Sequence, residues 1–121
     1  MKVPLDAQWN VPRNSVEHLQ LGRQAANEAE RVLPFFEKEC PDDSRPRDAI
    51  TALRAWALGQ RQLGMAEVRK LSLDSHAAAR EAKTKPATFA ARAAGQAVAT
   101  WHVPRHAKGA RDYAVKVEGN G

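Results

Sequence analysis

Three histidines in the second half of the chain are the residues whose type and spacing could do chemistry. His102 and His106 are four residues apart, the spacing that puts two imidazoles on one face of a helix, and His76 precedes them. Pro104 separates the pair, and no carboxylate or cysteine stands at an offset that completes a zinc site. We therefore predict no metal and expect the histidines to form hydrogen bonds at a helix junction. A histidine-centred ligand or metal site stays open as an alternative.

Motifs for covalent catalysis and nucleotide binding are equally thin. Ser72 and Ser75 lie near His76, but neither follows a strand or sits in the glycine elbow of a hydrolase. The sequence contains neither a glycine-lysine-serine phosphate loop nor the paired-glycine turn of a dinucleotide site. It predicts no catalytic residue, no cofactor and no enzymatic activity.

The elements that must position these residues are predicted to be helices. Residues 76–82, 89–103 and 104–114 are rich in alanine, the strongest helix former, and contain almost no strand-forming stretch. Hydrophobic residues make up 43% of the chain but aromatic residues only 6%, so small side chains must build the core at close helix spacing. The chain is expected to be all-α, a compact bundle of about five helices.

Capping residues and prolines predict where these helices begin and end. Asn14 or Ser15 is expected to cap the first helix. Pro34 is expected to end or kink that helix at Leu33, because proline lacks an amide hydrogen and clashes with the preceding turn. The later helices are expected over about residues 46–59, 65–83, 87–102 and 104–117.

One domain is expected over residues 1–121, because a chain of this length has no room for a second. Residues 1–13 are expected to form an irregular arm, with Trp9 pinning it to the body. Residues 118–121 are expected to form a frayed tail.

The fourth helix is predicted to lie at the centre of the bundle. A helix that is apolar on two sides packs on two sides. Because its small residues allow close approach, Gly95→Leu is expected to cost on the order of 1–3 kcal/mol or more by overpacking. One stripe contains Ala90, Ala94, Ala97 and Trp101, and the other contains Ala91, Gly95 and Val98.

Charge is unevenly distributed along the chain. Residues 1–60 carry 8 lysines and arginines against 9 acidic residues, whereas residues 61–121 carry 11 against 5. A basic half attracts polyanions or an acidic protein surface, although long basic side chains also suit solvated helix faces. The basic residues are spread over three helices and interleaved with acidic ones, unlike those of a DNA-recognition helix. Nucleic-acid binding therefore stays open only as an alternative.

The expected compartment is the cytoplasm. The single cysteine, Cys40, cannot form an internal disulfide, and residues 1–6 show no charged-then-apolar secretory leader. No apolar run approaches the roughly 20 residues that span a bilayer, so no membrane partner is expected.

Two groups of motifs resemble a bacterial protein family. The first runs through ERVLPFFE at residues 30–37, PDD at 41–43, RPRDAI at 45–50 and RAWA at 54–57. The second contains HAAAREA at residues 76–82 and AARAAGQAVATWHVPRHAKGARDYA at 90–114. In order and spacing these segments resemble the all-helical immunity proteins of bacterial polymorphic toxin systems, the immunity-protein-five-like group. The resemblance covers nearly the whole chain after residue 14.

This resemblance implies an intracellular, non-enzymatic protein that binds and neutralises a cognate toxin. The chain departs from the family pattern at Gln96, where histidine is expected, and at Trp101, where a small residue is expected. Assembly of identical copies stays open. The polar positions within the motifs form a candidate functional or structural cluster: His76, Arg80, Arg92, His102 and His106. The candidate partner-binding residues in the basic half are Arg105, Lys108 and Arg111.

Overall fold

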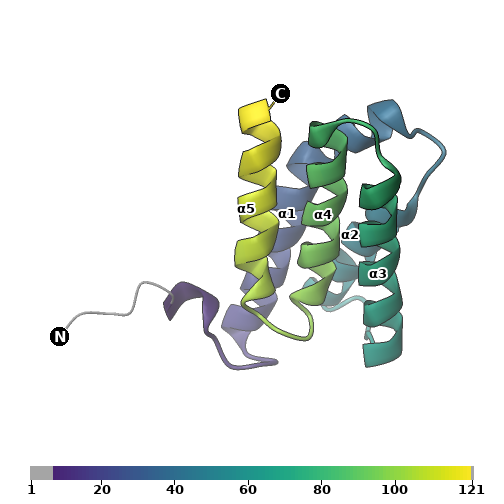
Figure 1. Cartoon of the computed structure of the whole chain (residues 1–121). Coiled ribbons are helices and arrows are strands. Elements are labelled where there is room, and N and C mark those ends of the chain that lie inside the picture. The colour runs from purple at the N-terminus through teal and green to yellow at the C-terminus, as the bar shows by residue number, and fades with distance from the viewer. Residues whose placement is uncertain (1–6, 121) are drawn as a thin grey trace.

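A short 3-10 turn and five α-helices make up the computed structural model, which describes residues 7–120 (Figure 1). The predicted all-α bundle is confirmed, with no strand in this part of the chain. The elements are η1 (Ala7–Trp9), α1 (Val16–Glu39), α2 (Arg45–Ala57), α3 (Met65–Glu81), α4 (Lys85–Ala99) and α5 (His106–Asn120).

Helix α4 lies at the centre, as predicted. In Figure 1, α5, α4 and α3 stand side by side, with α1 and α2 behind them. Helix α4 packs against each of the other four helices. Both of its small-residue faces are buried, which allows neighbouring backbones to approach closely. The buried residues of α4 are Ala87, Ala90, Ala91, Ala93, Ala94, Gly95, Ala97 and Val98.

Larger apolar side chains fill the core on the α1 and α2 side. Phe36 and Leu33 of α1 and Leu53 of α2 have no exposed surface. Glycine permits another close contact there, because a Cβ on Gly22 would lie 2.9 Å from the Trp56 ring. The two layers therefore differ in construction, with bulky residues on one side of α4 and small residues on the other.

The expected end of the first helix at Leu33 is wrong, because α1 continues through Pro34 to Glu39. Pro34 is exposed, so its ring projects toward solvent. The turn around it buries Val32, Leu33 and Phe36 in the core. That burial on the inner face offsets the loss of one backbone hydrogen bond on the outer face.

The ends of the last two helices also differ from the predicted ones. Thr84 caps α4 through a hydrogen bond from the Ala87 amide, and the helix ends at Ala99, short of residue 102. Helix α5 begins at His106 and reaches Asn120, so residues 118–120, expected in a frayed tail, are helical. The side chain of Glu118 accepts two hydrogen bonds from Arg31 of α1, which ties this last turn to the bundle.

The described part of the N-terminal arm is anchored as expected. Trp9 of η1 is 7% exposed and belongs to the hydrophobic core. Ser15 caps α1 by accepting a hydrogen bond from the His18 amide. Residues 1–6 of the expected arm and Gly121 of the expected tail lie outside the described residues.

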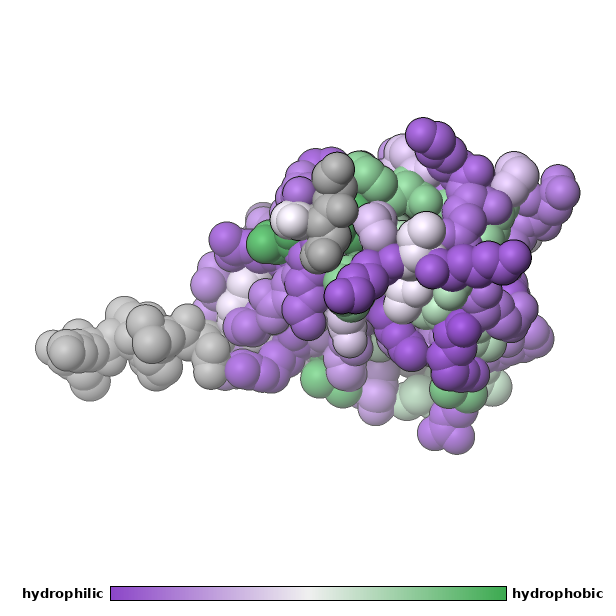
Figure 2. All heavy atoms as spheres, turned by 45° about the horizontal axis from the view of Figure 1, so that its top comes forward, coloured by the Kyte–Doolittle hydropathy of each residue, from purple (hydrophilic) through white to green (hydrophobic). Residues whose placement is uncertain are grey.

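Hydrophilic residues cover most of the face seen in Figure 2, with scattered hydrophobic ones between them. Within residues 7–120, no helix combines the length and apolar character needed to cross a bilayer.

Candidate functional site

His76 and Arg92 form the centre of the predicted polar cluster. An N–H of the Arg92 guanidinium donates to His76 Nδ1 at 2.8 Å, joining α3 to α4. Arginine has no acceptor, so His76 must present a lone pair at Nδ1 and be neutral. Burial, followed by the charges of Arg92 and Arg80, lowers the pKa of His76 from 6.5 to about 4.

Gly95 of α4 provides the surface on which the His76 ring lies. A Cβ at Gly95 would be 2.6 Å from His76 Nε2 and 2.8 Å from Cε1, so no other residue leaves the ring in place. Ser72, one turn before His76 on α3, donates to the Gly95 carbonyl at 3.1 Å. The imidazole is therefore positioned by the close approach of two helices.

His106, the first residue of α5, contacts Gln96 of α4. The Gln96 side-chain oxygen accepts a hydrogen bond from His106 Nδ1 at 2.8 Å. Gln96 in turn packs on Gly109 of α5, where a Cβ would be 2.7 Å from its oxygen. Burial is the main cause that lowers the pKa of His106, with a smaller contribution from His102. Gln96 of α4 thus contacts both His106 and Gly109 of α5.

The cluster is brought together as one face of α3, α4 and α5. Arg80 is exposed, and its charge lowers the pKa of His76. The half-buried His106 also lowers the pKa of His76. His102 is exposed and shares a hollow with His106. We call His76, Arg80 and Arg92 the cationic cluster.

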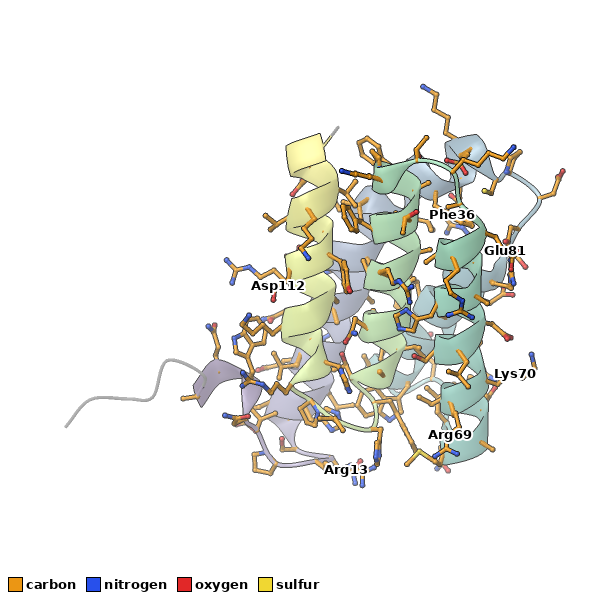
Figure 3. All side chains as sticks on the ribbon, viewed as in Figure 1. Arg13, Phe36, Arg69, Lys70, Glu81 and Asp112 are labelled. Carbon is orange, nitrogen blue, oxygen red and sulfur yellow. The ribbon has the colours of Figure 1, made fainter. Side chains whose placement is uncertain are left out.

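An apolar hollow of about 190 Å³ lies beside this cluster, between α3 and the junction of α4 with α5. Met65 and Leu73 on its wall are 40% and 59% exposed, and Arg69 lies between them on α3. Figure 3 shows Arg69 and Lys70 toward the start of α3, with Glu81 toward its other end. The hollow is lined by Met65, Val68, Arg69, Ser72, Leu73, Ala99, His102 and His106.

The three candidate partner-binding residues do not form one surface. Arg105 and Lys108 line a shallow hollow together with Asp112, and Lys108 donates to Asp112 at 2.8 Å. Arg111 lines a different hollow, beside Trp9.

His18 is a fully buried histidine that sequence reasoning missed. The Asn14 amide donates to its Nδ1 at 2.9 Å, so its Nε2–H donates to the Thr100 carbonyl at 2.6 Å. Its ring meets the Trp56 ring edge-on at 4.9 Å. Burial is the main cause that lowers its pKa. His18 follows the predicted cap Ser15 by three residues, in the first turn of the helix. This position was the available signal that His18 could contact the start of the helix.

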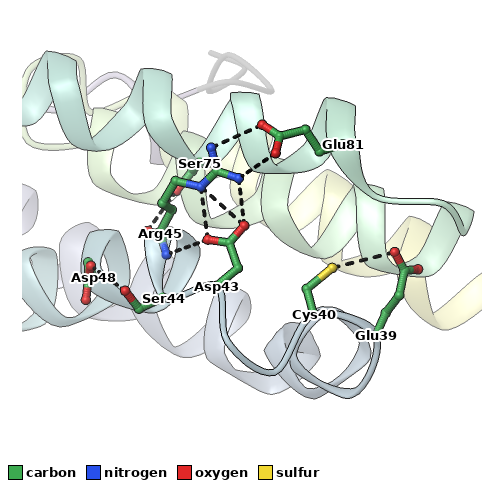
Figure 4. A network of polar contacts seen from close by, with 8 residues as sticks. All are labelled: Glu39, Cys40, Asp43, Ser44, Arg45, Asp48, Ser75 and Glu81. Atoms are coloured by element: carbon green, nitrogen blue, oxygen red, sulfur yellow. Dashed lines mark hydrogen bonds and ion pairs between the residues drawn. The ribbon is translucent and has the colours of Figure 1, made fainter.

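Many polar residues of the first group of motifs have structural partners. Arg45 binds the carboxylates of Asp43 and Glu81, linking the α1–α2 loop to the end of α3 (Figure 4). Arg47 pairs with Glu37 in the same way. These contacts join the loop and α2 to α1 and α3, so these charged residues have structural roles.

Cys40 and Glu39 also belong to this region. Cys40 is a free thiol, and burial, together with the neighbouring Glu39, raises its pKa, which weakens it as a nucleophile. The Glu39 carboxylate accepts from the Lys83 and Thr84 amides, and these bonds lower its pKa. Glu39 therefore stabilises the residues that precede α4.

No group of three or more histidine, cysteine or carboxylate side chains suited to a metal ion occurs in the described part of the chain. The histidines instead pair with arginine, glutamine and backbone groups. As arranged, the cationic cluster can bind an anion.

No match was found among curated proteins or among solved structures. The sequence model of the family described as Imm-5 like putative immunity protein matches residues 13–120, which are all five helices and the whole cluster. The chain therefore belongs to the Imm-5 like putative immunity protein family.

Proposed function

We propose that this protein neutralises a cognate bacterial toxin by binding it stoichiometrically in the cytoplasm, without catalysis. The observation that carries the proposal is the family match over residues 13–120. Immunity by binding needs a complementary surface and no reactive group. Neither the cationic cluster nor the contact between His106 and Gln96 forms a catalytic arrangement of nucleophile, base and orienting group.

The charge of the second half supports an acidic partner. Residues 61–121 carry 11 basic residues against 5 acidic ones. Exposed charges at the edge of an interface mainly raise the association rate, whereas buried aromatic or arginine anchors set the lifetime of the complex. The exposed Met65 and Leu73 add apolar surface on the same half of the chain.

The test is co-expression with the toxin-like product of a neighbouring gene. We expect the chain to restore growth and to co-purify with that product as a complex of fixed stoichiometry. A chain that neither rescues growth nor yields a complex at low salt is not an immunity protein for that toxin. Tight binding to RNA or DNA that falls steeply with salt would instead favour a nucleic-acid-binding function.

A further inference from the structure

We propose that the cationic cluster and the adjacent apolar hollow form one docking surface, which binds an acidic side chain and a neighbouring apolar side chain of the toxin. The inference rests on the proposed function and adds the contact surface and the chemistry of the partner. Its centre is Arg92 on α4, a different place from the basic end of α5.

Arg92 differs in its partner from five other arginines of this protein. Arg31, Arg45, Arg47, Arg54 and Arg61 each pair with a carboxylate. Arg92 is half-buried, and within residues 7–120 its hydrogen-bond partner is the neutral His76 ring rather than an acid. A half-buried guanidinium without a carboxylate partner can gain stability by binding one, because burying a charge is costly unless the charge is paired.

The structure holds this guanidinium in a defined orientation. The His76 ring is fixed between Gly95 and Arg92, and its lone pair accepts one Arg92 N–H. A guanidinium has five N–H donors in a planar fork, which leaves donors for a carboxylate. An arginine ordered before binding loses less side-chain entropy when the partner arrives.

Arg80 and the hollow place further contacts next to Arg92. Arg80 follows His76 by four residues, about 6 Å along α3, and supplies a second positive charge. Ser72 precedes His76 by one turn and lines the hollow. Leu73, which is 59% exposed, precedes His76 by three residues on α3, so exposed apolar surface lies about one helical turn from the His76–Arg92 pair.

A carboxylate fits this surface better than a nucleic-acid backbone does. Phosphates repeat along a nucleic-acid strand, so binding them requires a continuous row of lysine and arginine side chains on the protein. Here Asp74 and Glu81 lie on α3, and Asp112 lies on α5, so acidic groups interrupt the positive charge on both sides. The exposed Leu73 also favours an apolar protein contact.

The experiment measures the affinity of the toxin-like gene product for variants of the full chain by calorimetry. Arg92→Gln is expected to weaken binding by about 30-fold or more, as for an interface anchor. Its matched control is Arg23→Gln, which removes an equal charge from an exposed position on α1 and is expected to change affinity by less than about twofold.

The hollow is tested in the same way. Leu73→Ala is expected to weaken binding by about tenfold, whereas Leu58→Ala, at the end of α2, is expected to leave it within about twofold. Both leucines are exposed, at 59% and 48%, so neither change should unfold the protein. The melting temperature of every variant is measured alongside.

The outcomes separate the two proposals. If the wild-type chain binds the toxin and Arg92→Gln, folded, binds equally well, the docking surface is wrong while the immunity function stands. If the wild-type chain binds no toxin, both fail. Should Arg92→Gln weaken binding of RNA while toxin binding is unchanged, Arg92 contacts a polyanion and the docking surface is again overturned. Recovery of Arg92→Glu binding by an acidic-to-arginine change in the toxin would confirm the contact.

Discussion

His76 serves two contacts at once, since its ring packs on Gly95 while its Nδ1 accepts from Arg92. Gly95→Ala adds a methyl group where the ring now lies. We expect this change to lower the free energy of unfolding by about 1–3 kcal/mol, because His76 must move and lose its Arg92 contact. Chemical denaturation measures the loss.

Two further variants test this explanation. Gly119→Ala, on α5, has open space around the new Cβ and is expected to be neutral or to stabilise by up to about 1 kcal/mol. In a His76→Ala background, Gly95→Ala should cost little, because the obstructing ring is gone. Equal costs in both backgrounds would show that His76 is not the cause.

The neutral histidines predict a loss of stability in mild acid. Folding lowers the pKa of His18 and His106 below 6.5 and that of His76 to about 4. The unfolded chain therefore binds more protons below pH 6.5, and the free energy of unfolding falls as pH decreases from there. Each such histidine contributes a slope of up to about 1.4 kcal/mol per pH unit.

Unfolding at pH values between about 7.5 and 5 checks this, above the range where carboxylates titrate. His18→Gln should lower stability at neutral pH and flatten the dependence, because its buried ring has an acceptor role at Nδ1 that protonation destroys. The control Gln20→Ala changes an exposed, non-titrating side chain on the same helix and should keep the wild-type slope. A wild-type curve that is flat over this interval would contradict the prediction.

Sequence reasoning gathered the polar residues of the site but could not assign their partners. The spacing of His102 and His106 suggested a shared helix face, yet His106 pairs with Gln96 across helices. Such pairs depend on the packing of α3, α4 and α5, which local spacing does not specify. His18 was missed for the same reason, since its acceptor is the distant Thr100 carbonyl.

At the scale of elements, the capping signals located the helix starts, and tertiary packing decided the rest. Ser15 caps α1, as its residue type predicted, and Thr84 caps α4, which begins two residues before its predicted start. The helix was expected to end or kink at Leu33 because local propensity ignores the burial of Leu33 and Phe36, which favours continuing α1 past Pro34. A proline on an exposed face is thus a weak helix terminator.

The entry to α4 is stabilised from another helix, which gives a further prediction. The Glu39 carboxylate accepts from the Lys83 and Thr84 amides and from the Thr84 hydroxyl. Glu39→Gln replaces one acceptor by a donor and should lower the free energy of unfolding by about 0.5–1.5 kcal/mol. Amide hydrogen exchange at Lys83 and Thr84 should accelerate.

Asp42→Asn is the matched control for that change. Asp42 is exposed in the same loop, and losing its charge should affect neither the exchange of these amides nor the stability. Unaltered exchange in Glu39→Gln would mean that Thr84 caps α4 without help from α1.

At the scale of the whole molecule, the all-α bundle and its central helix followed from alanine content and the two apolar faces of α4. The division into a bulky α1–α2 layer and a small-residue layer did not, because it depends on which faces meet. The net charge of the second half predicts an electrostatic effect on partner association.

Replacing Arg105, Lys108 and Arg111 by alanine should slow toxin association by about tenfold at low salt and reduce its salt dependence. Lys108 should contribute less than Arg111, because Asp112 already offsets the charge of Lys108. Stopped-flow kinetics measures the rate, and circular dichroism checks that the helices are intact. A variant with Arg23 and Lys38 of α1 changed to alanine serves as the control. If it slows association as much, the effect reflects net charge rather than the positions of these three residues.

The packing of α1 has a consequence for synthesis of the protein on the ribosome. Helix α1 is covered by α4 and α5, which are translated last, so its apolar face emerges well before its cover exists. Growing chains of this kind expose apolar surface and recruit chaperones until the final helix is released. On the proposed function, a cell is protected only by finished chains, so translation of the immunity protein must be completed before toxin accumulates.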